Sequence, residues 1–183
     1  MVDLKAGVVV ALLLLSGCSS TTSSTTPPVT ATYSVPKTCE LPKILAAFDA
    51  QVTGSKYIKT DWQPDKGTDL YDVLKAGGIA CTYGIQVAEI GGTVLLSPIS
   101  NSAWEKKKTA WLSSGQILID LAGIDESSAT ILKEGSTSAD EMHVWGVNLL
   151  YKGIWIQVNA SFLQTTQEAL PIIQAAIDSL ITQ

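Results

Sequence analysis

Arginine is absent from this sequence of 183 residues, and all 12 of its basic residues are lysine. Since arginine is the side chain best suited to bidentate recognition of phosphate, and the net charge is −5, we expect no nucleic acid among the partners. Histidine is nearly as scarce, with His143 alone, and only three cysteines are present. The usual transition-metal sites therefore lack ligands, and we expect no metal and no other cofactor.

The sequence also lacks a hydrophobic run long enough to cross a membrane as a helix. The apolar run at residues 6–15 follows Lys5 and has about half of the roughly 20 residues that a transmembrane helix needs. A basic residue, a short apolar run and small residues are typical of a secretory signal. The order Leu-Ser-Gly-Cys ending at Cys18 resembles the lipobox of bacterial lipoproteins, in which the cysteine is acylated and begins the mature chain. The alternative is an ordinary signal peptide with a cysteine at this place by chance.

Charged residues are missing from residues 19–35, which consist mainly of Ser, Thr and Pro. Such a segment cannot bury enough apolar surface to offset the entropy lost on ordering. We therefore expect a signal peptide at 1–17, the lipidated Cys18 with a disordered tether at 18–35, and a single folded domain at 36–183. Two or three acyl chains on one cysteine would hold the mature chain at the extracytoplasmic face of its membrane.

Two cysteines, Cys39 and Cys81, remain once Cys18 is assigned to the lipid anchor. An even pair in an oxidising compartment favours a disulfide. A redox-active pair is the alternative, but the two residues do not have Cys-x-x-Cys spacing and no basic group nearby favours a thiolate.

Periodicity in the first part of the domain predicts helices and one hairpin. A helix should begin near Pro42 and stop at Gly54, and one or two helical turns should follow at 69–76. The stretches 79–90 and 93–99 flank two glycines, which we take as the turn of a β-hairpin. That register places on the core face Cys81, Tyr83, Ile85, Val87, Val94 and Leu96.

The second part predicts a further helix, four strands and a closing helix. Ser102 and Glu105 form a capping box for a helix ending at Gly115, and Thr165 and Glu168 form another for the closing helix. Between them, "QILIDL" and "SATILKEG" read as strands, and 144–161 as a hairpin turning at Lys152-Gly153. The order helix-β-β-helix-β-β-β-β-helix indicates an α+β fold, an antiparallel sheet of about six strands with helices packed on it.

The hairpin at 144–161 has two faces of different character. One is apolar and should face the core: Trp145, Val147, Leu149, Tyr151, Ile154, Ile156 and Val158. The other carries an aromatic ring among amides, and we take as a candidate binding face Trp155, Asn148, Leu150, Gln157 and Asn159. Such a surface suits a glycan or a peptide. The alternative is that a helix covers this face and the amides bond to the backbone.

Motifs for catalysis are absent. There is no Walker loop, dinucleotide-binding turn or nucleophile elbow, and His143 stands near the start of a strand, where a structural or exposed imidazole is the simpler reading. We therefore assign no catalytic residue and expect that the protein is not an enzyme.

Several short features together resemble small exported lipoproteins of actinobacterial type. They are the lipobox, the Ser/Thr-rich tether, "TCEL" before the first helix, "GGIACTYG" leading a strand, and tryptophan-bearing strands before a closing helix. The layout is also similar to the PsbP-like arrangement of an antiparallel sheet between helices. The resemblance implies a fold and a compartment, and no catalytic residue.

These observations favour a lipid-anchored extracytoplasmic protein, held at the membrane through Cys18, that binds an envelope protein, peptide or glycan. A second hypothesis is an accessory or assembly subunit of an envelope transporter or cell-wall enzyme complex. A third is a hydrolase with an unrecognised site.

Overall fold

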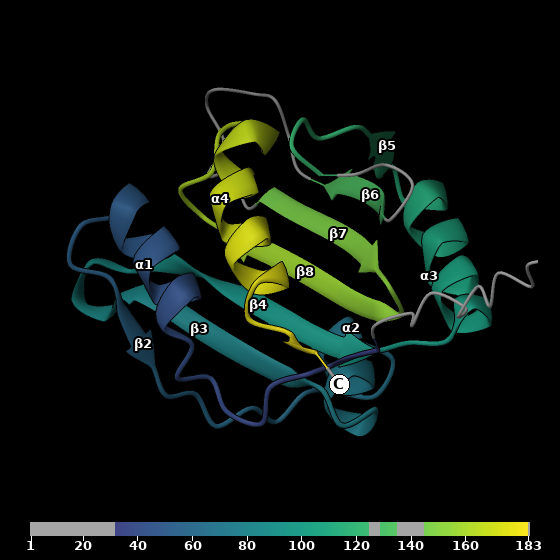
Figure 1. Cartoon of the computed structure of the whole chain (residues 1–183), viewed down its shortest axis with the longest axis horizontal. Helices are drawn as coiled ribbons and strands as arrows, with labels where there is room; N and C mark the ends of the chain where they lie inside the picture. Colours follow the sequence, from purple (N-terminus) through teal and green to yellow (C-terminus); the bar gives the residue numbers. More distant parts are fainter. Residues whose placement is uncertain (1–31, 125–128, 135–144, 183) are drawn as a thin grey trace, which may run out of the picture. The chain divides into compact units, whose positions relative to one another are not determined.

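The computed structural model describes residues 32–124, 129–134 and 145–182. Within these residues the fold is α+β, as predicted, with four α-helices, a 3₁₀ turn and nine strands (Figure 1). The helices are α1 (Pro42–Gln51), α2 (Asp69–Lys75), α3 (Asn101–Ser113) and α4 (Thr166–Ile177), and the 3₁₀ turn is η1 (Gln86–Ala88). The strands are β1 (Tyr33–Ser34), β2 (Lys56–Ile58), β3 (Ile79–Ile85), β4 (Ile90–Pro98), β5 (Ile117–Ile119), β6 (Ala129–Glu134), β7 (Trp145–Tyr151), β8 (Ile154–Ala160) and β9 (Ile181–Thr182).

Seven strands form one antiparallel sheet in the order β2-β3-β4-β8-β7-β6-β5. The sheet is one strand wider than the six expected, because Lys56–Ile58 pairs with the outer edge of β3. None of the described helices is long and apolar enough to cross a membrane.

A second, two-stranded sheet joins the start of the folded domain to its end. Tyr33 pairs with Thr182 and Ser34 with Ile181. The Tyr33 ring also contacts the ring of Tyr151 at 5.6 Å between centroids. Residues 33–35, which were predicted to belong to the tether, are therefore part of the domain, because the side chains of Tyr33 and Val35 pack against the main core.

The hairpin at the centre of the sheet has the predicted turn and register. Tyr151 pairs with Ile154 across Lys152 and Gly153, whose φ angles of 47° and 82° are those of a type I′ turn. Val147, Leu149, Ile156 and Val158 lie in the main core, as expected.

The other predicted hairpin has its turn in a different place. Gly91 and Gly92 lie inside β4, and the turn is made by η1 together with Glu89, whose φ is 55°. A glycine is needed at position 92 because a Cβ there would overlap the carbonyl oxygen of Asn159 on β8. The shift moves the pairing by an even number of residues, so Cys81 and its neighbours keep their predicted core face. Val87 and Ile85 do not: Val87 is 97% exposed at the tip of the turn, and Ile85 is half-buried outside the main core.

The N-terminal cap of α4 agrees with the prediction, whereas that of α3 does not. The capping box of α4 forms between Thr165 and Glu168 as expected. Helix α3 begins two residues earlier than its predicted box, because the Ser100 side chain accepts from the backbone N–H of Ala103. Glu105 pairs instead with Lys108, at 2.8 Å.

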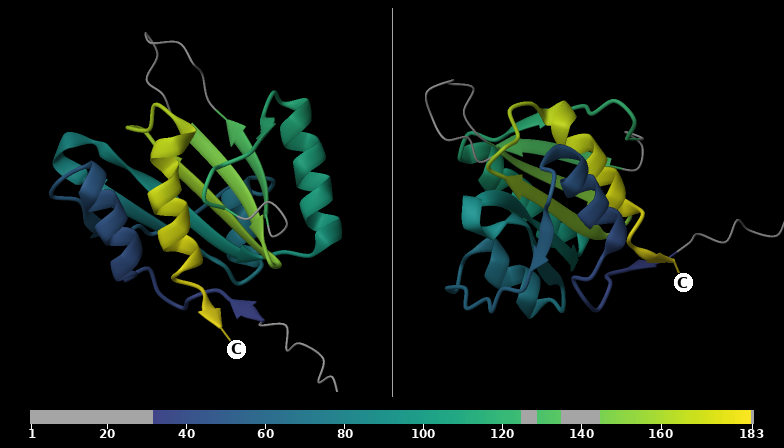
Figure 2. Two further views of the ribbon diagram at one scale, coloured as in Figure 1. Left: turned by 45° about the horizontal axis from the view of Figure 1, so that its top comes forward. Right: turned by 90° about the vertical axis from the view of Figure 1, so that its left-hand side faces the viewer.

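Helices cover the two faces of the sheet unequally. On one face, which we call the core face, α1 and α4 pack over the whole width of the central strands and bury the main core (Figure 2). On the other face, α2 and α3 pack over one end only, around a smaller cluster of Val73, Ala80, Leu95, Trp104, Trp111 and Trp155. The rest of this second face is left without a helix above it.

The predicted disulfide is present. Cys39 and Cys81 are bonded, with 5.2 Å between their Cα atoms. The bond joins the segment before α1 to the core face of β3, and the buried Tyr83 hydroxyl donates a 2.8 Å hydrogen bond to the Cys39 carbonyl.

Candidate functional site

The predicted binding face does not lie open at the surface. Trp155 is 1% exposed and Asn148 is fully buried. The Trp155 indole donates to Asn148 Oδ1 at 2.9 Å, and the Gln157 amide donates to the same oxygen at 3.0 Å. Asn148 Nδ2 in turn donates to Gln116 Oε1 at 3.1 Å. The amides thus satisfy one another inside the protein.

Helix α3 covers this network. The Trp111 ring lies 5.4 Å from the Trp155 ring, and the Lys107 ammonium lies 4.8 Å above the Trp155 ring centroid. The covered alternative is therefore the correct one for Trp155, Asn148 and Gln157, with side-chain amides in place of the backbone groups expected as partners. Leu150 is half-buried against the same cluster.

Helix α3 is linked to α2 by ion pairs between one lysine and two carboxylates. Lys107 Nζ lies 2.8 Å from Asp69 and 2.7 Å from Asp72, and Asp69 also accepts from the Trp111 indole at 3.1 Å. Burial by itself lowers the pKa of Lys107, but hydrogen bonds to the two carboxylates and their charges outweigh it, so the pKa lies above its usual value. The ammonium stays charged, and the cover is a structural element.

The part of the second face that no helix covers forms a groove. The strand registers place four side chains in one row across β2, β3, β4 and β8, and these are Ile58, Thr82, Thr93 and Asn159. Adjacent strands are about 4.8 Å apart, so the row presents polar groups at that interval. Asn159 is the one predicted site residue that reaches this groove.

Aliphatic and small residues complete the groove, which we call the neutral groove. Ile85 and Ile90 stand at the η1 side, and Gly91 and Gly92 leave the floor bare beside them. The groove is open to solvent and has a volume of about 400 Å³, which is within the range of small-molecule sites. Glu89 is the one charged residue among the described residues that line it.

Two polar side chains of the neutral groove have unused hydrogen-bonding capacity. Thr82 accepts a hydrogen bond from the Thr60 hydroxyl at 3.2 Å, and Ser161 donates to the Gly91 carbonyl at 3.2 Å. Thr93 and Asn159 are half-buried, and among the described residues neither side chain has a hydrogen-bond partner. Because both side chains are half-buried and not used within the described protein, their polar atoms are open to solvent and can bond to a ligand.

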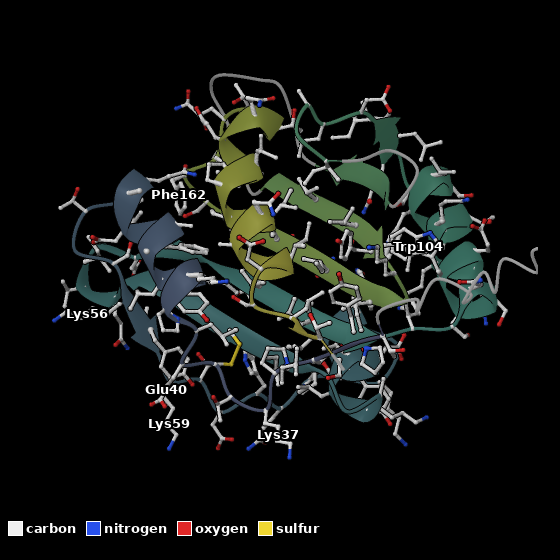
Figure 3. The ribbon with its side chains drawn as sticks, viewed as in Figure 1. Lys37, Glu40, Lys56, Lys59, Trp104 and Phe162 are labelled. Atoms are coloured by element: carbon white, nitrogen blue, oxygen red, sulfur yellow. A yellow bond between two sulfur atoms is a disulfide. The ribbon has the colours of Figure 1, made fainter. Side chains whose placement is uncertain are left out.

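A second hollow of about 520 Å³ continues the neutral groove around the edge of the sheet. The two share Ile58, Ile85 and Gln86. The second hollow, which we call the lysine hollow, is also lined by Lys56 and Lys59, and Figure 3 shows both side chains pointing away from the ribbon near β2. In the described part of the chain neither lysine forms an ion pair.

Catalytic groups do not gather in either hollow. The described residues hold no cluster of His, Cys, Asp and Glu that could bind a metal ion. Tyr83 has a raised pKa because it is buried, but it lies on the core face, bonded to Cys39. The predicted lipidation site Cys18 and the lone histidine, His143, lie outside the described residues.

Sequence reasoning missed Thr82 and Thr93 because it placed the turn at Gly91-Gly92, which pairs each threonine with the wrong residue. The available signal was the polar position between buried neighbours in each strand. Comparisons with protein-family models, with curated proteins and with solved structures find no match to this chain. Its function is therefore argued from the site.

Proposed function

We propose that this chain is a lipid-anchored extracytoplasmic protein whose domain binds a ligand bearing hydroxyl or amide groups in the neutral groove, without catalysis. The observation that carries the binding role is the pair Thr93 and Asn159, half-buried in an aliphatic-walled groove with unused hydrogen-bonding capacity. A ligand that supplies these two partners gains hydrogen bonds where water is partly excluded.

The sequence and the disulfide support the anchored, exported location. The leader resembles that of lipoproteins, and a bond between Cys39 and Cys81 is typical of proteins outside the cytosol. Because the domain begins at Tyr33, the tether shortens to residues 19–32.

The binding role is tested by mass spectrometry under native conditions on the full chain, purified gently from the cells that make it. We expect wild type to carry a small molecule and Thr93→Trp, which fills the groove, to lose it. Thr109→Trp, on the exposed side of α3, is the matched control and should keep it. A molecule retained equally by wild type and Thr93→Trp would contradict the proposal.

The anchor is tested by metabolic labelling with a clickable palmitate analogue. Wild type should take up label and partition into the membrane fraction, whereas Cys18→Ala should do neither. Equal labelling of both chains would contradict lipidation of Cys18 and would not affect the proposed binding in the neutral groove.

A role as an accessory subunit is the second candidate, and one observation favours it. Ile117 and Leu118 are 54% and 57% exposed on β5, the outer strand of the seven-stranded sheet. An apolar edge strand with a free side is a surface on which another chain can add a strand. A photo-crosslinking residue at position 118 should capture one envelope protein if this role is correct, and nothing specific if it is not.

A further inference from the structure

We infer that the ligand of the neutral groove is an acidic saccharide, whose hydroxyls lie on the Thr93–Asn159 row and whose anionic group reaches the lysine hollow. This inference rests on the proposed function, because it uses the same groove and adds the charge and the chemical class of its occupant.

The row across the strands indicates a saccharide. Thr82, Thr93 and Asn159 present two hydroxyls and an amide at intervals of about 4.8 Å, which is close to the length of one pyranose unit. Hydroxyls and amides both donate and accept, so they match sugar hydroxyls of either orientation. The C–H faces of a sugar ring can pack on the aliphatic walls at Ile58 and Ile90.

The charged residues that line the two hollows favour a ligand whose anionic group lies in the lysine hollow. Lys56 and Lys59 line one end, and no described carboxylate forms an ion pair with either. Glu89 lines the neutral groove, so an anionic group is repelled there and is favoured near the lysines. The shared residues Ile58, Ile85 and Gln86 let one ligand extend from the neutral floor to the lysines.

The probes are tetragalacturonic acid and its fully methyl-esterified form, which differ in charge and share the sugar chain. Isothermal titration calorimetry is done on the full chain in detergent micelles. We expect wild type to bind the acid about fivefold more tightly than the ester, the size of effect that one or two exposed ion pairs supply. The preference should weaken as salt is added, because both lysines are exposed.

The variants separate this inference from its alternatives. Lys56→Gln/Lys59→Gln should bind acid and ester equally, and Lys106→Gln, an exposed lysine on α3, should keep the preference. Thr93→Trp should bind neither probe. Lysines at a sheet edge can also prevent that edge from pairing with other chains. If Lys56→Gln/Lys59→Gln changes the oligomeric state and leaves probe binding unchanged, the lysines have that role and the inference is overturned.

The two proposals fail in different ways. Equal binding of acid and ester by wild type, lost in Thr93→Trp, would overturn the acidic saccharide and leave the groove as a binding site for neutral ligands. Absence of binding by either probe to wild type would also overturn the inference. The proposed function is contradicted as well only if native mass spectrometry finds the same retained molecules in Thr93→Trp as in wild type.

Discussion

Asn148 holds the covered end of the second sheet face together through its two polar atoms. Its carbonyl oxygen accepts from Trp155 and Gln157, and its amide donates to Gln116. Two residues further along β8 from Gln157, Asn159 has no such partners and faces the open groove. The same residue type therefore has a structural role at one position and a proposed binding role at the other.

Truncation of each asparagine should separate these roles. Asn148→Ala strands the buried Trp155 and Gln157 donors and should lower the free energy of unfolding by about 2–4 kcal/mol. Asn159→Ala removes a side chain without protein partners and should cost less than about 1 kcal/mol. Urea denaturation of the two variants measures both values, and equal losses would contradict the assignment.

The ion pair of Lys107 makes a prediction about pH. Lys107→Met should lower the unfolding free energy by about 1–2 kcal/mol, since solvent partly screens Asp69 and Asp72. The pKa of Lys107 is raised in the folded chain, so its stabilising effect is complete below the unfolded value of 10.5 and is lost as pH rises through the folded value. The difference between wild type and variant should stay constant from pH 7 to about 10 and shrink above that. A difference that already shrinks near neutral pH would contradict this.

At the scale of elements, the sequence predicts best where a local rule fixes geometry. Lys152-Gly153 demands a type I′ turn, and this alone set the register of β7 and β8. The pair Gly91-Gly92 carries the same signal but serves close packing against β8, which depends on a strand more than sixty residues away. For the same reason the Thr82–Thr93–Asn159 row was not predictable, since it exists only in the assembled register.

Helix α3 shows how tertiary contacts decide the function of a face. Trp104 and Trp111 of this helix form one cluster with Trp155, a tertiary contact that no local sequence pattern predicts. The candidate binding face is buried for that reason, and of its polar residues only Asn159 lies beyond the part that α3 covers.

The packing role of Gly92 is tested by substitution. Gly92→Ala should destabilise the fold by about 2–3 kcal/mol, because the added Cβ meets backbone of β8 that cannot move aside. Gly67→Ala meets no atom within 4 Å but has a φ of 92°, and strain alone should cost about 1 kcal/mol. Thermal unfolding followed by circular dichroism compares the two, and a smaller effect at position 92 would show that its neighbours relax.

At the scale of the whole molecule, the disulfide joins two distant parts of the chain and should stabilise the fold. Cys39 and Cys81 are 42 residues apart, and closing a loop of that size stabilises a fold by about 4 kcal/mol on the chain-entropy model. Cys39→Ser/Cys81→Ser should show this loss in guanidinium denaturation. Wild type measured under a strong reductant should match the double variant, and an unchanged midpoint in both would contradict the role assigned to the bond.

The central claim is that the uncovered part of the second sheet face binds a ligand. The most direct measurement is a crystal structure of the chain purified from its own cells together with whatever it carries. We predict electron density in the neutral groove, within hydrogen-bonding distance of Thr93 and Asn159. A carried molecule seated elsewhere on the domain, with this groove holding only solvent, would contradict the account.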